Sequence, residues 1–218
     1  MYSILMPIYN GIEFIEESVN SIINQTFTEW ELIISINGHS ENSEVYNIAK
    51  KYEGDKIKIY DLHTIKGKSN TLNQSLQYCK YDKICLLDVD DIWLPKKLEI
   101  QLPYINQYDV VGTYCEYFGE RGGVPELVVG QISPIFFRVM NPIINSSACF
   151  NKKDAHWNSE FDSVEDYDMW LRLASEGKIF YNVNEILVKH RLHHSSFFNS
   201  SNNQINKKDL LMKKYFTN

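Results

Sequence analysis

The most informative segment of this sequence is Leu86-Leu87-Asp88-Val89-Asp90-Asp91-Ile92-Trp93-Leu94-Pro95. The run from Lys83 to Leu87 predicts a buried β-strand, and three carboxylates follow it within four positions. In open parallel sheets the ligand crevice lies beyond the carboxyl ends of the strands. Residues that directly follow a strand are therefore the first candidates for a functional site.

The residues that precede this segment alternate between short β-rich runs and amphipathic stretches. Strands are predicted over residues 3–8, 31–36, 57–62 and 83–87, and helices over residues 12–25, 43–52 and 69–81. In the first helix, apolar residues recur at helical spacing at Ile15, Val19, Ile22 and Ile23. This order is typical of a mostly parallel central sheet with helices on both faces, so the predicted fold class is α/β.

The residues that follow the acidic segment are less regular. Helices are predicted from Pro95 to about Asn106 and from Val164 to Ser175, a helical turn at 135–137, and strands over residues 108–118 and 186–190. The sequence contains no internal repeat and no domain linker. We therefore expect a single domain over residues 1–218, with an N-terminal half (1–95), a C-terminal half (96–195) and a polar tail (196–218).

The composition of the 218 residues excludes several classes of protein. With 44% hydrophobic and 23% charged residues, the chain is neither disordered, nor collagen-like, nor a small disulfide-stapled domain. The formal net charge of −6 argues against a nucleic acid as partner, because phosphate backbones are bound through basic surfaces. Four cysteines without a CxxC spacing are expected to be reduced and mostly buried, which favours a cytoplasmic protein.

The sequence predicts no membrane-spanning segment, since no apolar run approaches the ~20 residues that a spanning helix needs. The polar tail carries two lysine pairs, Lys207-Lys208 and Lys213-Lys214. Such pairs can hold an acidic protein against an anionic membrane surface, or they can simply be solvated. A peripheral membrane contact is therefore one of two interpretations of the tail.

The three carboxylates of the acidic segment, Asp88, Asp90 and Asp91, call for a counter-cation. Carboxylates accompanied by water and diphosphate oxygens suit a hard cation such as Mg²⁺ or Mn²⁺. The alternative is a solvated acidic turn that caps the following helix. Their position directly after a buried strand favours the metal site.

Two further clusters carry charged side chains. Glu165 and Asp166 fall in the first turn of a predicted helix, where the helix dipole stabilises negative charge, so a simple acidic bias also explains them. The run His190-Arg191-Leu192-His193-His194-Ser195 follows a predicted strand and brings side chains that can bind phosphate. Strand-end histidines are also common as plain surface residues.

Taken together and in this order, these segments resemble the family 2 glycosyltransferases, which have the GT-A fold and use nucleotide sugars. The resemblance runs from Ile4 to about Ser196. The matching segments are Pro7-Ile8-Tyr9-Asn10, residues 18–27, Glu31-Leu32-Ile33-Ile34, Gly67-Lys68-Ser69 with Leu72-Asn73, residues 87–95, Asn145-Ser146-Ser147, residues 165–173 and Arg191-Leu192-His193. The resemblance implies that residues 1–95 bind the nucleotide and residues 96–195 bind the acceptor.

The resemblance also implies where the donor binds. The residues expected to contact the nucleotide sugar are Pro7, Tyr9, Asn10, Asn37, Lys68, Asn73, Asp88, Arg191 and His193. The residues expected at a Mn²⁺ or Mg²⁺ ion are Asp88, Asp90, Asp91 and His193. Among the metal residues, Asp90 would bind the metal that bridges both phosphates, and Asp91 would orient its neighbours. Arg191, one of the residues expected at the nucleotide sugar, would close over the diphosphate.

Asp166 matches the catalytic base of the family, and Glu165 would lie beside it in the acceptor site. A departing nucleoside diphosphate carries negative charge, which a divalent cation and an arginine can stabilise. The acceptor hydroxyl must lose a proton as it attacks from the opposite face of the sugar, and a carboxylate can accept that proton. Because one base with direct attack inverts the anomeric configuration, we expect an inverting transfer to a hydroxyl of a glycan or glycolipid.

The sequence departs from the family pattern after the second predicted strand. Family members usually place an aspartate there to read the uracil edge, whereas this chain has Asn37, whose amide can donate as well as accept. A UDP-sugar is the first expectation for the donor, and TDP- and GDP-sugars stay open. The rival functions are an inactive nucleotide- or sugar-binding module of the same fold and a sugar nucleotidyltransferase, although residues 7–11 lack the basic side chains of a triphosphate loop.

Overall fold

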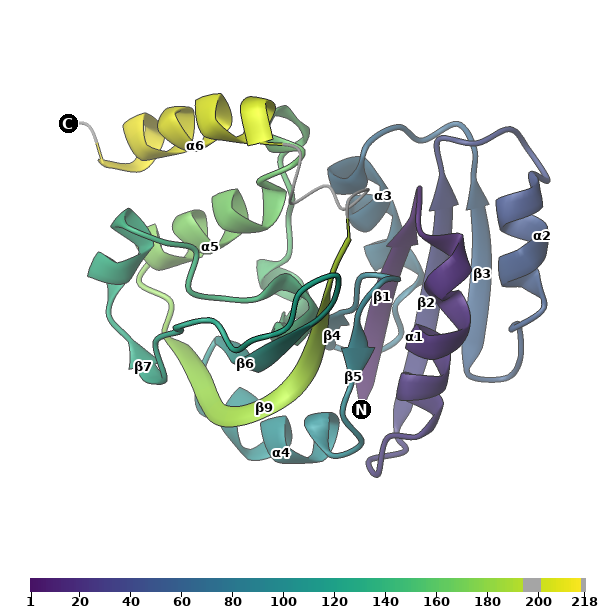
Figure 1. Cartoon of the computed structure of the whole chain (residues 1–218), viewed down its shortest axis with the longest axis horizontal. Helices are drawn as coiled ribbons and strands as arrows, with labels where there is room; N and C mark the ends of the chain where they lie inside the picture. Colours follow the sequence, from purple (N-terminus) through teal and green to yellow (C-terminus); the bar gives the residue numbers. More distant parts are fainter. Residues whose placement is uncertain (194–200, 217–218) are drawn as a thin grey trace.

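The computed structural model describes residues 1–193 and 201–216 and shows a curled sheet with helices on both faces (Figure 1). The strands are β1 (Tyr2–Ile8), β2 (Trp30–Asn37), β3 (Ile57–Leu62), β4 (Lys83–Leu86), β5 (Ile92–Trp93), β6 (Val110–Gly119), β7 (Gly130–Ile132), β8 (Cys149–Asn151) and β9 (Phe180–Leu192). The α-helices are α1 (Ile15–Ile23), α2 (Glu44–Lys50), α3 (Lys68–Ser75), α4 (Lys97–Ile105), α5 (Glu165–Ser175) and α6 (Ser201–Phe216).

The strands pair in the order β3-β2-β1-β4-β8-β6-β9-β5, and β7 pairs with β9 outside this path. The neighbours among β1, β2, β3 and β4 are parallel, as are β6 and β9. Only β8, β5 and β7 run antiparallel to the strands they contact in the described part of the chain. The predicted mostly parallel α/β sheet is confirmed, and the carboxyl ends of β1, β2 and β4 meet at one edge.

Alternating side chains of β1 supply apolar residues to both faces of the sheet. Ile4, Met6 and Ile8 belong to the core that α1, α2 and α4 cover, whereas Leu5 belongs to the core under α3, α5 and α6. In this second core, Trp170 packs edge-on against Phe150 and Phe180. Truncating a buried aromatic residue of this kind to alanine costs about 3–5 kcal/mol, so this cluster anchors α5 to the sheet.

Most predicted elements are present with shifted ends. The strand predicted over 57–62 coincides with β3, but the helix predicted over 69–81 ends at Ser75 and continues as a 3-10 turn over Leu76–Tyr78. The helix predicted from Pro95 begins at Lys97, because the Lys97 N–H donates to the Leu94 carbonyl in a turn that leaves β5. These corrections leave every predicted strand of the N-terminal half in place.

From β5 onward the chain contains strands that the sequence pattern does not predict. β5, β7 and β8 are absent from the prediction, and β9 is predicted only over 186–190 although it begins at Phe180. The first part of β9 contains Asn182, Asn184 and Glu185, which break the apolar pattern. The buried Asn182 donates from Nδ2 to the carbonyls of Val128 and Pro142, both at 2.8 Å.

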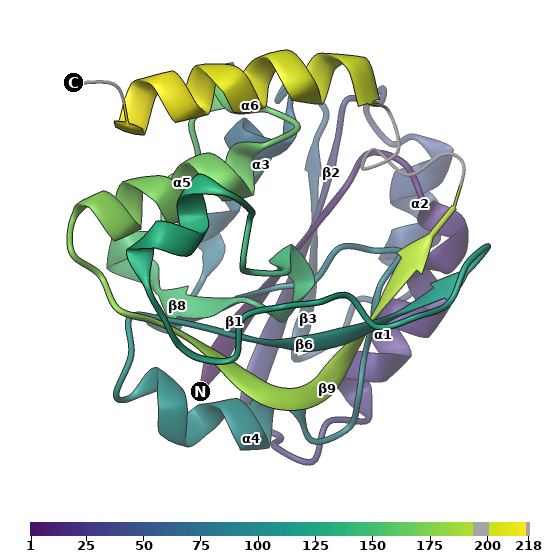
Figure 2. The same ribbon diagram turned by 60° about the vertical axis from the view of Figure 1, so that its left-hand side comes forward.

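Within the range of the expected polar tail, residues 201–216 form α6; the rest of residues 196–218 lies outside the described residues. Figure 2 shows α6 lying over α5, and its Leu211 is fully buried. Lys207 donates to the main-chain carbonyl of Asp162 (2.6 Å), and Lys214 donates to Asp168 Oδ1 (2.8 Å). Two of the four lysines that could face a membrane are therefore bound to the protein itself.

The structure bears on two expectations from the sequence, the absence of a membrane-spanning helix and the burial of the four cysteines. None of the helices in residues 1–193 and 201–216 is long and apolar enough to cross a bilayer. The four cysteines are free and buried, as expected, and Cys85 and Cys149 lie opposite each other on β4 and β8.

Candidate active site

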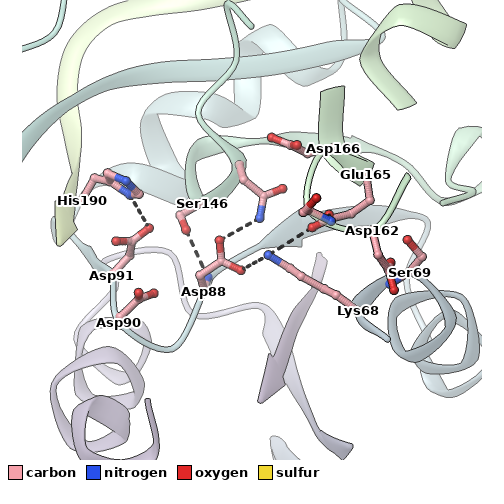
Figure 3. Close-up of polar contacts among 12 residues, drawn as sticks. Lys68, Ser69, Asp88, Asp90, Asp91, Ser146, Asp162, Glu165, Asp166 and His190 are labelled. Atoms are coloured by element: carbon pink, nitrogen blue, oxygen red, sulfur yellow. Dashed lines mark hydrogen bonds and ion pairs between the residues drawn. The ribbon is translucent and has the colours of Figure 1, made fainter. Parts of the chain in front are cut away.

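A lysine joins the carboxylates of the two halves of the chain (Figure 3). Asp88 comes shortly after β4, and Lys68 is the first residue of α3. Lys68 Nζ lies 2.7 Å from Asp88 Oδ1 and 3.5 Å from Glu165 Oε1. Because Glu165 and Asp166 open α5, the residues expected at the donor and those expected at the acceptor lie at one site.

Hydrogen bonds fix Asp88 in the ionised form. Asn145 Nδ2 donates to Asp88 Oδ2 (2.9 Å), and the Asp88 N–H donates to Ser146 Oγ (3.1 Å). Burial opposes ionisation of Asp88, but the charge of Lys68 and the hydrogen bonds from Lys68 and Asn145 outweigh it and lower its pKa. Burial likewise opposes the charge on Lys68, and the carboxylates of Asp88 and Glu165 outweigh it and raise the lysine pKa. This ion pair therefore persists at neutral pH.

The acidic bend is tied to the end of β9. Asp91 is only 1% exposed and accepts hydrogen bonds from His190 Nδ1 (3.0 Å) and the Arg191 N–H (2.9 Å). Asp90 is more open, with a side chain 23% exposed, and its Oδ2 lies 3.0 Å from His193 Nε2. These contacts suit Asp91 for holding β9 in place. Asp88 is as exposed as Asp90, at 24%, but Lys68 and Asn145 bind it, so Asp90 is the carboxylate of the bend most accessible to a cation.

The charges around the bend are unevenly compensated. Burial, followed by the charges of Asp91 and Asp88, raises the pKa of Asp90. Burial would lower the pKa of His190, but the adjacent Asp91 outweighs it and brings that pKa to about 9, so His190 is protonated at neutral pH.

Arg191 is held against the bend from several sides. Its Nε donates to the Asp90 carbonyl (2.9 Å), and its guanidinium lies over the rings of Phe14 (4.4 Å) and Phe118 (4.3 Å). The Arg191 Nη2 also lies 3.0 Å from Glu17 Oε1. The arginine is therefore fixed beside Asp90.

The bend fits a divalent cation that completes its coordination on a substrate. Among the described residues, no group of three or more histidine, cysteine, aspartate or glutamate side chains could hold a metal ion by itself. Mg²⁺ and related ions are commonly held by one or two carboxylates together with phosphate oxygens and water. The accessible Asp90, next to His193 and crowded by two other carboxylates, is a donor set of that kind.

Asp166 lies in the first turn of α5, where Asn141 Nδ2 donates to its Oδ2 (2.9 Å). Burial, followed by the charge of Glu165, raises the pKa of Asp166 to about 6, although Lys68 acts in the opposite direction. Such a carboxyl is ionised at pH 7 and still basic enough to accept a proton. Glu165 differs, because its carboxylate is held by the Ser163 N–H (2.7 Å) and by Lys68.

The residues expected at the nucleoside lie at the ends of β1 and β2. The Tyr9 ring is 56% exposed and packs against the His39 ring, with 5.4 Å between centroids. Gly38 has a φ of +75°, and a Cβ there would come within 2.6 Å of the Tyr9 ring, so only glycine fits. Asn37 is buried at the end of β2, Pro7 is half-buried and Asn10 is exposed. An exposed aromatic face at this edge can stack on a nucleobase.

Asn73 is placed differently from the other predicted donor residues. Its Nδ2 donates to the Trp157 carbonyl (2.7 Å), and its Oδ1 accepts from the Trp157 N–H (3.0 Å). Both ends of the amide therefore hold the main chain at Trp157 rather than meeting the acidic cluster. Of the His190–Ser195 run, His194 and Ser195 lie outside the described residues.

Four residues of the site are absent from the residues expected at the donor, the metal and the acceptor: Asn141, Asn145, Asp162 and His190. Asn145 lies in a segment that matches the family and His190 in the run expected to bind phosphate, so the sequence offered a signal for both. Asn141 and Asp162 belong to no motif, because Asn141 meets Asp166 and Asp162 meets Ser69 only in the folded chain.

A family model and a relative of known name match this sequence. The model of the family described as glycosyl transferase family 2 matches residues 3–158. The O-antigen biosynthesis glycosyltransferase WbnJ of Escherichia coli is 32% identical over 212 residues, which is 90% of this chain and 81% of WbnJ.

Two solved structures share the fold. Residues 1–349 of S. aureus TarS, in complex with UDP-GlcNAc, superpose with a TM-score of 0.77 at 15% identity, over 100% of this chain and 68% of that TarS fragment. The mannosyltransferase PcManGT from Pyrobaculum calidifontis, in complex with GDP-Man and Mn²⁺, superposes with a TM-score of 0.67 at 14% identity, over 90% of this chain and 58% of PcManGT. With the sequence match to WbnJ and the family model, they lead to one conclusion: this chain belongs to glycosyl transferase family 2 and is a glycosyltransferase of the GT-A fold.

Proposed function

We propose that this enzyme transfers a sugar, with inversion, from a nucleoside diphosphate sugar to a hydroxyl of a glycan or glycolipid. The observation that carries the proposal is the position of Lys68 Nζ, 2.7 Å from Asp88 and 3.5 Å from Glu165. Asp88, expected to serve the donor, and Glu165, expected to serve the acceptor, both lie next to this ammonium, which supports a single site for the two substrates. The O-antigen role in the name of WbnJ supports a carbohydrate acceptor.

On the donor side, the nucleoside would lie against Tyr9 and Asn37, and the diphosphate would lie between Asp90 and Arg191. Asp90 and His193 would hold a Mn²⁺ or Mg²⁺ ion, in line with the Mn²⁺ bound in PcManGT. When bound, that ion supplies positive charge to the departing diphosphate. Arg191, held at the Asp90 carbonyl and over two phenyl rings, would supply a second positive charge at the same oxygens.

On the acceptor side, Asp166 would take the proton of the attacking hydroxyl. Asn141 orients the carboxyl by donating to Oδ2, a backbone hydrogen bond from Tyr167 adds to this, and the acceptor hydroxyl would donate to the same carboxyl. Glu165 would position this turn, because Ser163 and Lys68 already hold its carboxylate. A single base and direct attack lead to inversion of the anomeric configuration.

The donor can be identified by thermal unfolding in the presence of UDP-, TDP- and GDP-sugars, each with and without Mn²⁺. A ligand that binds only the folded state raises the unfolding temperature by mass action. We expect a metal-dependent rise with one nucleotide, with UDP first, although the amide of Asn37 also accommodates other bases. No rise with any nucleotide would contradict the proposal, and a rise without sugar transfer to any glycan acceptor would favour an inactive binding module.

The pH dependence of the transfer follows from Asp166. Because burial and Glu165 raise its pKa to about 6, the base is ionised above pH 6 and protonated below. We therefore expect kcat/KM to rise with pH through about 6 and then to level off. Initial rates over pH 4.5–8.5 at saturating metal would measure this limb, and a rate that stays flat down to pH 4.5 would argue against Asp166 as the base.

A further inference from the structure

Asp162 caps a helix that begins far from it in the sequence. The first residue before α3 is Gly67, which has no side chain to cap the helix, and Asp162 Oδ1 accepts the Ser69 N–H at 2.9 Å instead. A Cβ at Gly67, whose φ is +85°, would collide with Asp162 Oδ2. The first turn of α3 is therefore built around the Asp162 carboxylate (Figure 3).

This first turn carries Lys68. The lysine stands between Gly67 and Ser69, and its long side chain has to reach both Asp88 and Glu165. A lysine loses considerable rotamer freedom when its ammonium is held in one place. Its backbone must therefore be fixed for Nζ to stay between the two carboxylates, and the Asp162 cap fixes it.

Asp162 is also joined to the helix of the predicted base. Ser163 follows it with a φ of +90°, an unusual backbone for a residue with a side chain, and the Ser163 N–H donates to Glu165 Oε2 (2.7 Å). The hydrogen bond between Ser163 and Glu165 thus closes the turn from Asp162 to Glu165. The same short segment therefore sets both the start of α3 and the start of α5.

The C-terminal helix holds this segment on both sides of Glu165 and Asp166. On one side, Lys207 Nζ donates to the Asp162 carbonyl (2.6 Å). On the other side, Lys214 Nζ and the Tyr215 hydroxyl both donate to the buried Asp168 Oδ1 at 2.8 Å. α6 therefore braces the 162–168 segment against the sheet.

We propose that Asp162 is a positioning residue: by capping α3 from the acceptor half, it sets Lys68 at a fixed place between Asp88 and the Glu165-Asp166 pair. The consequence for turnover rests on the proposed function, whereas the position of Lys68 does not. Asp166 is faced by Glu165, which raises its pKa, and by Lys68 and Asn141, which lower it. Displacement of Lys68 is therefore expected to move the acid limb of kcat/KM to higher pH.

Two measurements on Asp162→Ala test the positioning without any activity. The first is hydrogen exchange of peptides that cover residues 67–75, where loss of the cap should speed exchange about tenfold, the scale of a lost N-cap. The second is the rate at which acetic anhydride modifies Lys68, whose side chain is 35% exposed, measured by peptide mass spectrometry. Freed from its two carboxylates, Lys68 should react faster, whereas Asp162→Asn, which keeps an accepting oxygen, should stay close to the wild type.

Activity measurements then test the consequence. We expect Asp162→Ala to lower kcat/KM roughly 10- to 100-fold, the scale for misplaced catalytic groups, and to shift the acid limb upward. Gly67→Ala should do the same, because its Cβ would displace the Asp162 carboxylate. Ser43→Ala is the matched control, since Ser43 Oγ caps α2 by accepting the Tyr46 N–H and contacts none of these residues.

The outcomes distinguish the positioning role of Asp162 from the proposed sugar transfer. Unchanged exchange and unchanged Lys68 reactivity in Asp162→Ala would overturn the positioning role, as would an acid limb and kcat/KM that match Ser43→Ala. If the wild-type protein bound nucleotide but transferred no sugar, the proposed function would fail, and the exchange and acetylation results would still decide the role of Asp162.

Discussion

Asp166→Asn is expected to lower kcat by about 10²–10⁴-fold, the usual contribution of a general base, while nucleotide binding stays nearly unchanged. The amide matches the shape of the carboxyl but cannot take the acceptor proton. Asn141, which donates to Asp166 Oδ2 in the wild type, can still donate to an amide oxygen there, so the turn should keep its geometry. Initial rates and the nucleotide-dependent rise in unfolding temperature would be measured on the same preparation.

Glu176→Gln provides the matched control for this substitution. It makes the same chemical change on a residue that follows α5 directly, where Glu176 forms only an exposed ion pair with Arg172. Exposed pairs of this kind contribute little to stability, so the rate should stay within about twofold of the wild type. An Asp166→Asn enzyme that was as active as Glu176→Gln would show that another group accepts the proton.

Asp90→Ala is expected to abolish the metal-dependent part of nucleotide binding. Asp90 is the accessible carboxylate of the acidic bend, and its removal would leave the cation with His193 and with carboxylates that are already bound by Lys68, His190 or the Arg191 N–H. A ligand present at 100 times its Kd stabilises the folded state by about 2.7 kcal/mol, so the loss would be plain in a thermal unfolding experiment. Titration of Mn²⁺ into the nucleotide complex would give the affinity directly.

The ligand-free stability of the Asp90→Ala protein should not fall. Burial and two neighbouring carboxylates raise the pKa of Asp90, so its ionised form is unfavourable in the folded protein without a cation. Asp55→Ala, which removes an exposed acidic residue before β3, controls for the change in net charge. If Asp90→Ala kept the full Mn²⁺-dependent rise, the cation would have to be assigned to other residues.

Much of the N-terminal half could be predicted because its order depends on local patterns. β-rich segments such as residues 57–62 and helical spacing such as Ile15, Val19 and Ile22 are visible within a few residues, and the parallel topology follows from the alternation of strands and helices. The C-terminal half resists this approach. β9 continues through Asn182 and Glu185 because β6 and β7 pair with it, and no local pattern reports a partner strand.

The candidate site likewise contains residues that the sequence indicates and residues whose role depends on the fold. The sequence singles out Asp88, Asp90 and Asp91 as candidates because they follow a buried strand, whereas the role expected of Asp166 rests on the resemblance, because an acidic first turn of a helix has a simpler explanation. Asn73 has the sequence context of a residue that binds the nucleotide sugar, yet both ends of its amide are hydrogen-bonded to the main chain of Trp157. Whether a polar side chain is free for a ligand depends on partners that are distant in the sequence.

Residue order alone is enough to establish the α/β class and the parallel order of the first strands, since both depend on periodicity and on the alternation of elements, and it leads to the expectation that the chemistry lies at the carboxyl ends of these strands. The folded chain alone shows that Lys68 links these carboxylates, that Asp162 caps α3 across 93 positions, and that α6 braces the segment of Asp166. These are contacts between ionised and hydrogen-bonding groups whose energies depend on ångström distances and burial. Both quantities are set by the packing of elements far apart in the chain.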